Sequence, residues 1–133
     1  MTLTNKQRKE AVRAFRKFAR MGFADEQLNP IQIYKRIDVL CHAHRIKIDM
    51  LALYDTLRLL ALSGDDETLR AVEEVYLSSA RRRFSENETS YLVRKYADKN
   101  YCDERTVYRR LHKAIALYIK IREKEGLLWD YGE

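Results

Sequence analysis

SENETSYLVRKYADKNYCDERTVYRRLHKAIAL, residues 85–117, is the stretch of sequence that decides the fold of this chain. It holds two amphipathic runs separated by a short polar segment around residues 99–102. In the second run Val107, Leu111 and Ala114 recur at the spacing that puts side chains on one face of a helix. We therefore expect a helix, a turn of three or four residues, and a second helix.

The rest of the 133-residue chain is also predicted to be helical, because one proline and four glycines leave few positions for hairpin turns. Amphipathic stretches predict helices over about 4–21, 30–44, 50–62, 65–80, from 85 to the turn, and 104–125. The fold class expected is all-α, with about six helices. Residues 1–80 would form an N-terminal helical lobe, and residues 81–133 a helix-turn-helix region with a long final helix, with a hinge at 81–84.

The expected helix boundaries depend on capping signals. Asn29-Pro30 is a strong helix start, because proline at the first helical position loses no hydrogen bond. Further starts are indicated by the capping boxes Thr4/Gln7 and Ser85/Glu88 and by Asp49, Asp65 or Asp66, and Asp103. The stop signals are Gly22, Ser63-Gly64 and Gly126.

The net charge of +6 is distributed in blocks. Residues 1–22 carry seven Lys/Arg and one acid, residues 23–79 carry six Lys/Arg and ten acids, and residues 80–125 carry thirteen Lys/Arg and seven acids. Two basic blocks around an acidic middle are typical of a protein that touches a polyanion with only some of its faces. Charge alone fits a solvated basic surface equally well.

Compartment and membrane contact are constrained by the cysteines and the apolar runs. Cys41 and Cys102 belong to no Cys-x-x-Cys pair, and no signal peptide is apparent. The uncharged apolar runs, such as residues 50–54 and 114–119, are far too short to span a bilayer. We therefore expect a cytoplasmic protein that does not contact a membrane.

The last predicted helix separates into a buried stripe and a cationic face when projected at 100° per residue. Arg105, Arg109 and His112 lie opposite the stripe, and a planar guanidinium can bond O6 and N7 of one guanine. Two arginines four residues apart reach neighbouring base pairs, so these residues are candidate base readers. Candidate phosphate contacts are Arg94, Lys95, Lys99, Thr106, Tyr108, Arg110 and Lys113. The alternative interpretation is an ordinary amphipathic helix with a solvated basic face.

The segment YADKNYCDERTV, residues 96–107, with its continuation RLHKA, residues 110–114, resembles the helix-turn-helix of sigma factor region 4. In that pattern an Ile-Ala pair, a Gly-Ile/Val turn, a Ser/Asp cap and Thr-Val recur in the same order. The resemblance implies that Glu104, Arg105 and Arg109 occupy base-reading positions. The pattern prefers glycine where this chain has Tyr101, so we expect Asn100 to supply the left-handed turn residue instead.

CDERTVYRRL, following LRLLAL at 57–62 and AVEEVY at 71–76, is similar to phage regulators of the RinA and ArpU type. These small sigma-like proteins switch on late, packaging or lysis genes. The resemblance is good over 85–117, looser over 57–84 and absent over 1–50. It implies a phage or prophage protein that reads duplex DNA and assists polymerase, since no counterpart of sigma region 2 is found.

We therefore expect a sequence-specific double-stranded DNA-binding transcriptional regulator. RNA polymerase and a second copy of the chain are candidate partners. The apolar residues Ile115, Leu117, Ile119 and Ile121 need cover from the amino-terminal lobe, from the tail or from that second copy. Two alternatives are a helix-turn-helix adaptor that docks another protein, and a small terminase-like DNA packaging subunit.

Other kinds of site find little support in the sequence. Cys41 and His44 share a helix face, but His42 points elsewhere and no second cluster supplies the missing zinc ligands. No phosphate-binding loop, nucleophile elbow or paired acid–base set appears. We expect no metal, no cofactor and no enzymatic activity.

Overall fold

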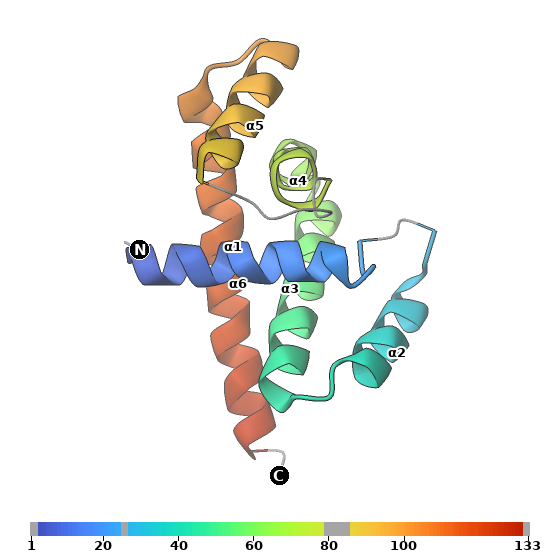
Figure 1. The fold of residues 1–133 in the computed structure, drawn as a ribbon. Coiled ribbons are helices and arrows are strands. Elements are labelled where there is room, and N and C mark those ends of the chain that lie inside the picture. The colour runs from blue at the N-terminus through green and yellow to red at the C-terminus, as the bar shows by residue number, and fades with distance from the viewer. Residues whose placement is uncertain (1–2, 25–26, 79–85, 132–133) are drawn as a thin grey trace.

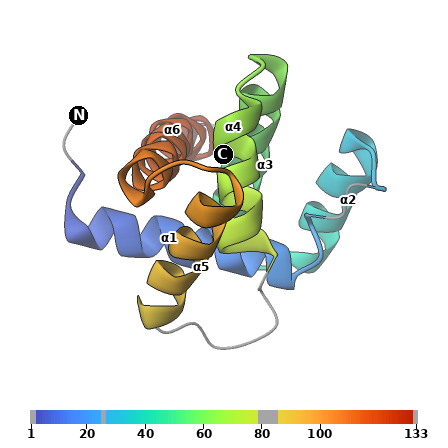
Figure 2. The same ribbon diagram turned by 90° about the horizontal axis from the view of Figure 1, so that it is seen from above.

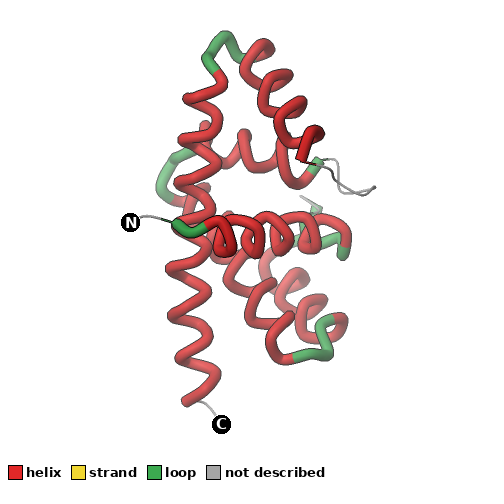
Figure 3. The backbone as a smooth tube through the Cα atoms, turned by 60° about the vertical axis from the view of Figure 1, so that its left-hand side comes forward, coloured by secondary structure: helices red, strands yellow, loops and turns green. Residues whose placement is uncertain are grey.

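The computed structural model describes the backbone of residues 3–24, 27–78 and 86–131, and every regular element in these ranges is a helix (Figures 1 and 3). The elements are α1 (Asn5–Arg20), α2 (Pro30–Leu40), α3 (His44–Leu62), α4 (Asp66–Val72), a π-helical turn η1 (Glu73–Leu77), α5 (Glu86–Lys99) and α6 (Glu104–Tyr131). The expected all-α fold of about six helices is confirmed. None of the described helices combines the length and apolar composition needed to cross a membrane.

Local capping chemistry fixes most of the helix starts. The side chain of Thr4 accepts a hydrogen bond from the amide of Gln7, whose own side chain accepts from the amide of Thr4. Asn29 and Gln32 repeat this box ahead of α2, with Pro30 in the first turn. These two starts are confirmed, because each side chain satisfies an amide that the first helical turn leaves without a partner.

The boundaries between α2 and α3 differ from the sequence prediction. The second helix ends at Leu40 rather than near His44, because Cys41 is buried in an extended conformation. α3 then begins at His44, five residues before the expected cap at Asp49. Asp49 lies inside α3 and accepts a hydrogen bond from Arg122 of α6. A long-range ion pair, not a helix start, accounts for this aspartate.

The fourth helix changes its hydrogen-bond register before it ends. Asp65 caps α4 as expected, accepting from the amide of Thr68 at 3.2 Å. From Glu73 the chain is π-helical, and the amide of Ser78 donates to the carbonyl of Glu73 at 2.8 Å. The expected helix end at Ala80, the basic run 81–83, the hinge at 81–84 and the cap at Ser85 lie outside the described residues.

α6 is the long axis of the molecule (Figure 1). It extends past the expected stop at Gly126 to Tyr131, so that prediction is wrong. Glycine lowers helix propensity by only about 1 kcal/mol, which the packing of a long helix can override. α3 runs beside α6, α4 packs against it and is seen end-on in Figure 1, and α1 crosses it near its middle.

One hydrophobic core joins the helices. Phe15 of α1 is fully buried, and its ring centroid lies 5.5 Å from that of Tyr76 in η1 and 5.8 Å from that of Tyr118 in α6. Ile115 and Ile119 of α6 are buried in the same core, and Leu117 and Ile121 pack against it. These four apolar residues of α6 are therefore covered by other parts of the same chain. The proposed division at residue 80 stays a prediction, although residues from both sides share this core.

Candidate nucleic-acid interface

The connection between α5 and α6 has the hydrogen bonding of a Schellman turn. Tyr101 adopts a left-handed conformation with φ 54°, and the amide of Cys102 donates to the carbonyl of Ala97 at 3.1 Å. Left-handed geometry at this position usually belongs to glycine. The side chain of Tyr101 is 98% exposed, so the conformation is imposed by the turn and not by side-chain packing.

The expectation that Asn100 would be the left-handed residue is wrong. Among the described residues other than glycine, Tyr101 alone has a positive φ. The amide of Asn100 donates to the carbonyl of Tyr96 at 3.0 Å and its side-chain amide donates to the same carbonyl at 2.8 Å. Asn100 therefore completes the last turn of α5, which moves the change of direction one residue further along.

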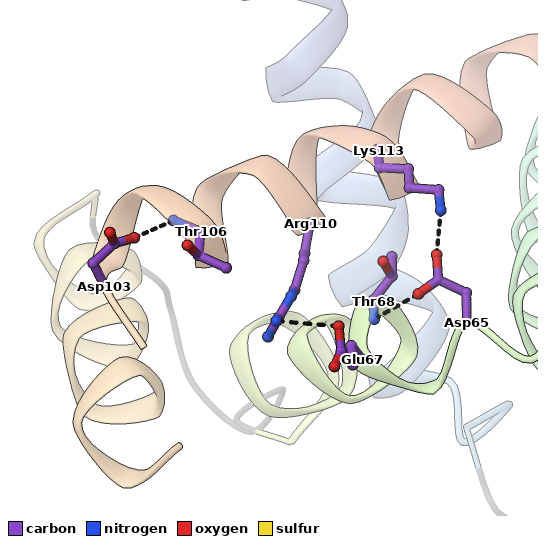
Figure 4. A network of polar contacts seen from close by, with 7 residues as sticks. All are labelled: Asp65, Glu67, Thr68, Asp103, Thr106, Arg110 and Lys113. Carbon is purple, nitrogen blue, oxygen red and sulfur yellow. Dashed lines mark hydrogen bonds and ion pairs between the residues drawn. The ribbon is translucent and has the colours of Figure 1, made fainter. Parts of the chain in front are cut away.

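Asp103 caps α6, as the sequence predicts. Its Oδ1 accepts from the amide of Thr106 at 2.7 Å (Figure 4). Hydrogen bonds from the side chain and the backbone of Thr106 lower the pKa of the Asp103 carboxyl. The backbone amide of Thr106, a predicted phosphate contact, is thus engaged by the cap.

The amphipathic division of α6 is confirmed. Val107, Leu111, Ala114 and Tyr118 are buried, as the helical projection requires. Glu104, Arg105, Tyr108 and Arg109 are exposed on the other side. The first turns of α6 therefore present two arginines four residues apart on a helix whose opposite face is fixed in the core. Together with the turn, they form the free end of the molecule in Figure 1.

The flank of α6 that faces α4 is neutralised by acids of the chain itself (Figure 4). Arg110 contacts Glu67 at 3.2 Å, and Lys113 donates to Asp65. The hydrogen bond from Lys113 is the main reason why the pKa of Asp65 lies below its ordinary value. Two of the predicted phosphate contacts are thus paired with the acidic middle of the sequence.

Two of the three predicted contacts on α5 also face acids. Lys99 contacts Glu74 of η1 at 3.2 Å, and Arg94 contacts Glu104 at 3.6 Å. Glu104, a predicted base reader, is thereby held toward α5. Lys95 is exposed on the same helix. Exposed ion pairs of this kind contribute about 0–1 kcal/mol, so a phosphate can compete for each cation.

A groove of about 540 Å³ separates the outward face of α6 from α1. Arg105, Arg109 and His112 of α6 line one side, and Arg8 and Val12 of α1 line the other. His112, predicted to read bases, is partly buried there and faces α1. Sequence reasoning missed the contribution of α1. Its signal was the basic block at residues 1–22, but nothing local places that block beside α6.

The remaining candidate site at Cys41, His42 and His44 is divided by the break between two helices. Cys41 is buried at the end of α2, and burial raises the pKa of its thiol. His44 is the first residue of α3. Within the described ranges, no three His, Cys, Asp or Glu side chains gather closely enough to hold a metal ion.

No protein-family model, curated protein or solved structure matches this chain.

Proposed function

We propose that this protein is a sequence-specific, double-stranded DNA-binding transcriptional regulator whose α6 enters the major groove by its first turns. The observation that carries the proposal is the pair Arg105 and Arg109. Both are exposed at the free end of α6, one helical turn apart, while Val107 and Leu111 hold the opposite face in the core. A rigid helix that presents planar donors at this spacing suits direct reading of guanine bases.

The arrangement around α6 supports this function in two further respects. The turn before α6 is short and hydrogen-bonded, and Asp103 caps the helix, so the arginines project from a well-ordered helix start. α3, α4 and α1 all pack against α6, which fixes its orientation relative to the rest of the chain. Such support is what precise base reading needs. Help to RNA polymerase, as in sigma-like regulators, is part of the proposal.

The test is selection of bound sequences from a random duplex pool, followed by binding measurements with the enriched and scrambled duplexes. Arg105→Ala and Arg109→Ala should each cost about 1–3 kcal/mol on the enriched duplex and relax the preference at one base position. Scrambled duplex should be affected much less. If no motif is enriched, or if both variants bind like wild type, the proposed function is refuted.

A second candidate function is that of an adaptor that binds another protein. The observation in its favour is the set of large apolar side chains exposed on α2 and at the end of α3, namely Ile31, Val39, Leu40, Leu59 and Leu62. An adaptor would leave the selection without a motif. Mass in solution adds a further distinction, since a ring of many subunits would favour a packaging role and a monomer or dimer would favour regulation.

A further inference from the structure

Two cationic grooves meet on α1. The first, of about 540 Å³, lies between α1 and the outward face of α6 and contains Arg8, Arg105 and Arg109. The second, of about 460 Å³, lies between α1 and the start of α5 and contains Arg8 and Lys9. Arg8 lines both grooves, so the basic surface runs without interruption from α6 across α1 toward α5. Figure 2 shows α1 passing beneath α5 and beside α6, which is seen end-on.

α1 is held firmly against the helix pair. The guanidinium of Arg16 donates to the hydroxyl of Thr89 in α5 at 2.7 Å, and Phe15 packs on Tyr118 of α6. The capping box at Thr4 fixes the start of the helix about three turns away from these contacts. The exposed basic residues of α1 therefore keep a constant position relative to the arginines of α6.

The two flanks of α6 differ in charge. On the flank toward α4, Arg110 and Lys113 are paired with Glu67 and Asp65. Among the residues that the structure describes, those that line the two grooves on the α1 side include no acid. A polyanion at the end of α6 therefore meets a neutralised surface on one side and a mainly cationic one on the other, which determines the direction in which it is expected to lie.

We propose that α1 is a second DNA-contacting element, in which Arg8 and Lys9 bind phosphates of the backbone that borders the groove entered by α6. This inference rests on the proposed function. It places the duplex on the α1 side of α6, with the flank toward α4 facing away from the duplex. The contacts hold the protein in register on the duplex without reading sequence, because a phosphate carries no base identity.

The salt dependence of binding measures such contacts. The affinity for duplex DNA falls by about 0.9 logarithmic units per phosphate contact for each tenfold rise in salt. The factor by which affinity falls between 50 and 200 mM salt should therefore be about 12-fold smaller for a variant that lacks two contacts. This change should be equal for enriched and scrambled duplexes.

The experiment compares two variants of the full chain that each lose one arginine and one lysine. Arg8→Gln/Lys9→Gln alters the proposed contacts. Lys35→Gln/Arg36→Gln is the matched control. Both of its altered residues are also exposed, and they belong to α2, which lies away from α5 in Figure 1. All four residues are on helix surfaces, and glutamine is a good helix former, so both variants should keep the wild-type circular dichroism and melting temperature.

We expect the α1 variant to show the 12-fold change and the α2 variant to stay within about twofold of wild type. Equal behaviour of the two variants would overturn the inference, because the effect would then reflect net charge alone. If wild type enriches a motif but the α1 variant keeps the wild-type salt dependence, only the contact by α1 is refuted. If wild type binds no duplex, both proposals fall.

Discussion

Replacement of Tyr101 by glycine is predicted to stabilise this protein. The Schellman turn that ends α5 needs a left-handed residue, and Tyr101 holds φ at 54° there. The same chain uses glycine in the two equivalent turns, Gly22 with φ 82° and Gly64 with φ 77°. After each of them, as after Tyr101, the next amide donates to the carbonyl five residues earlier. Tyr101 is thus the strained member of a set of three among the described residues.

The magnitude follows from two opposing terms. A residue with a Cβ pays about 1–2 kcal/mol to adopt the left-handed conformation, and glycine avoids that cost. Glycine in turn gives the unfolded chain more freedom, which lowers the free energy of unfolding by about 0.5–1 kcal/mol. The ring of Tyr101 is 98% exposed, so its removal loses no packing. The net expectation is a gain of about 0.5–1 kcal/mol, or about 2–5 °C in melting temperature for a chain of this size.

Thermal and urea unfolding, followed by circular dichroism, would measure this gain. Tyr101→Ala is the control for the side chain, because alanine removes the ring but keeps the backbone cost, and it should change stability by less than about 0.5 kcal/mol. Gly64→Ala is the mirror experiment. Beyond the two chain neighbours of Gly64, no heavy atom lies within 4 Å of the position of the added Cβ, so backbone strain alone should destabilise the variant by about 0.5–1 kcal/mol. If Tyr101→Gly lowered the melting temperature, or if Tyr101→Ala stabilised as much, backbone strain would not be the cause.

Two more predictions concern the core and its pH dependence. Phe15→Ala should lower the free energy of unfolding by about 3–5 kcal/mol, because Phe15 joins α1 to η1 and α6. Far- and near-ultraviolet circular dichroism should still show a single unfolding transition. Two separate transitions would mean that residues 1–80 and 81–133 fold independently. Burial, together with the neighbouring Asp55, raises the pKa of Glu125 from 4.5 to about 8. Between these two values the native state keeps a proton that the unfolded state releases. The stability that this group contributes is therefore complete below about pH 4.5 and is lost as pH rises through 8. The stability of Glu125→Gln relative to wild type should therefore increase between about pH 5 and 8. The increase should be about 1–2 kcal/mol once solvent screening of this half-buried group is allowed for. A constant difference in the free energy of unfolding across that range, measured by urea titration, would contradict the assignment.

The parts of the fold that were predictable from sequence are those that a few neighbouring residues determine. Thr4 with Gln7, Asn29 ahead of Pro30, and Asp103 begin helices as expected. At each start the capping side chain accepts a hydrogen bond from an amide of the first helical turn. The buried stripe beginning at Val107 followed from helical periodicity in the same way. These features need no knowledge of what packs against them.

The wrong predictions share a cause, which is that a local signal was outweighed by a distant partner or by the wider backbone. Asp49 has the chemistry of a cap, but Arg122, which is 73 residues away, uses its carboxylate inside a helix. Asn100 tolerates the left-handed conformation, yet its side chain closes the last turn of α5 on Tyr96. Glycine often ends a helix, yet α6 continues through Gly126. A tertiary contact overrides the local preference at Asp49, whereas at Asn100 the competing hydrogen bond lies within the same helix.

The charge pattern shows why the candidate interface was only half predictable. Counted along the chain, the basic blocks at 1–22 and 80–125 are separated by the acidic block at 23–79. In three dimensions the first block lies against one flank of α6, at Arg8, and the acidic block against the other, at Asp65 and Glu67. The amphipathic pattern of α6 identifies which face looks outward, but it treats both flanks alike, as cationic. Because folding neutralises one flank and extends the other, the direction that we propose for a duplex on α6 depends on the tertiary structure. The salt dependence of the α1 variant measures that property.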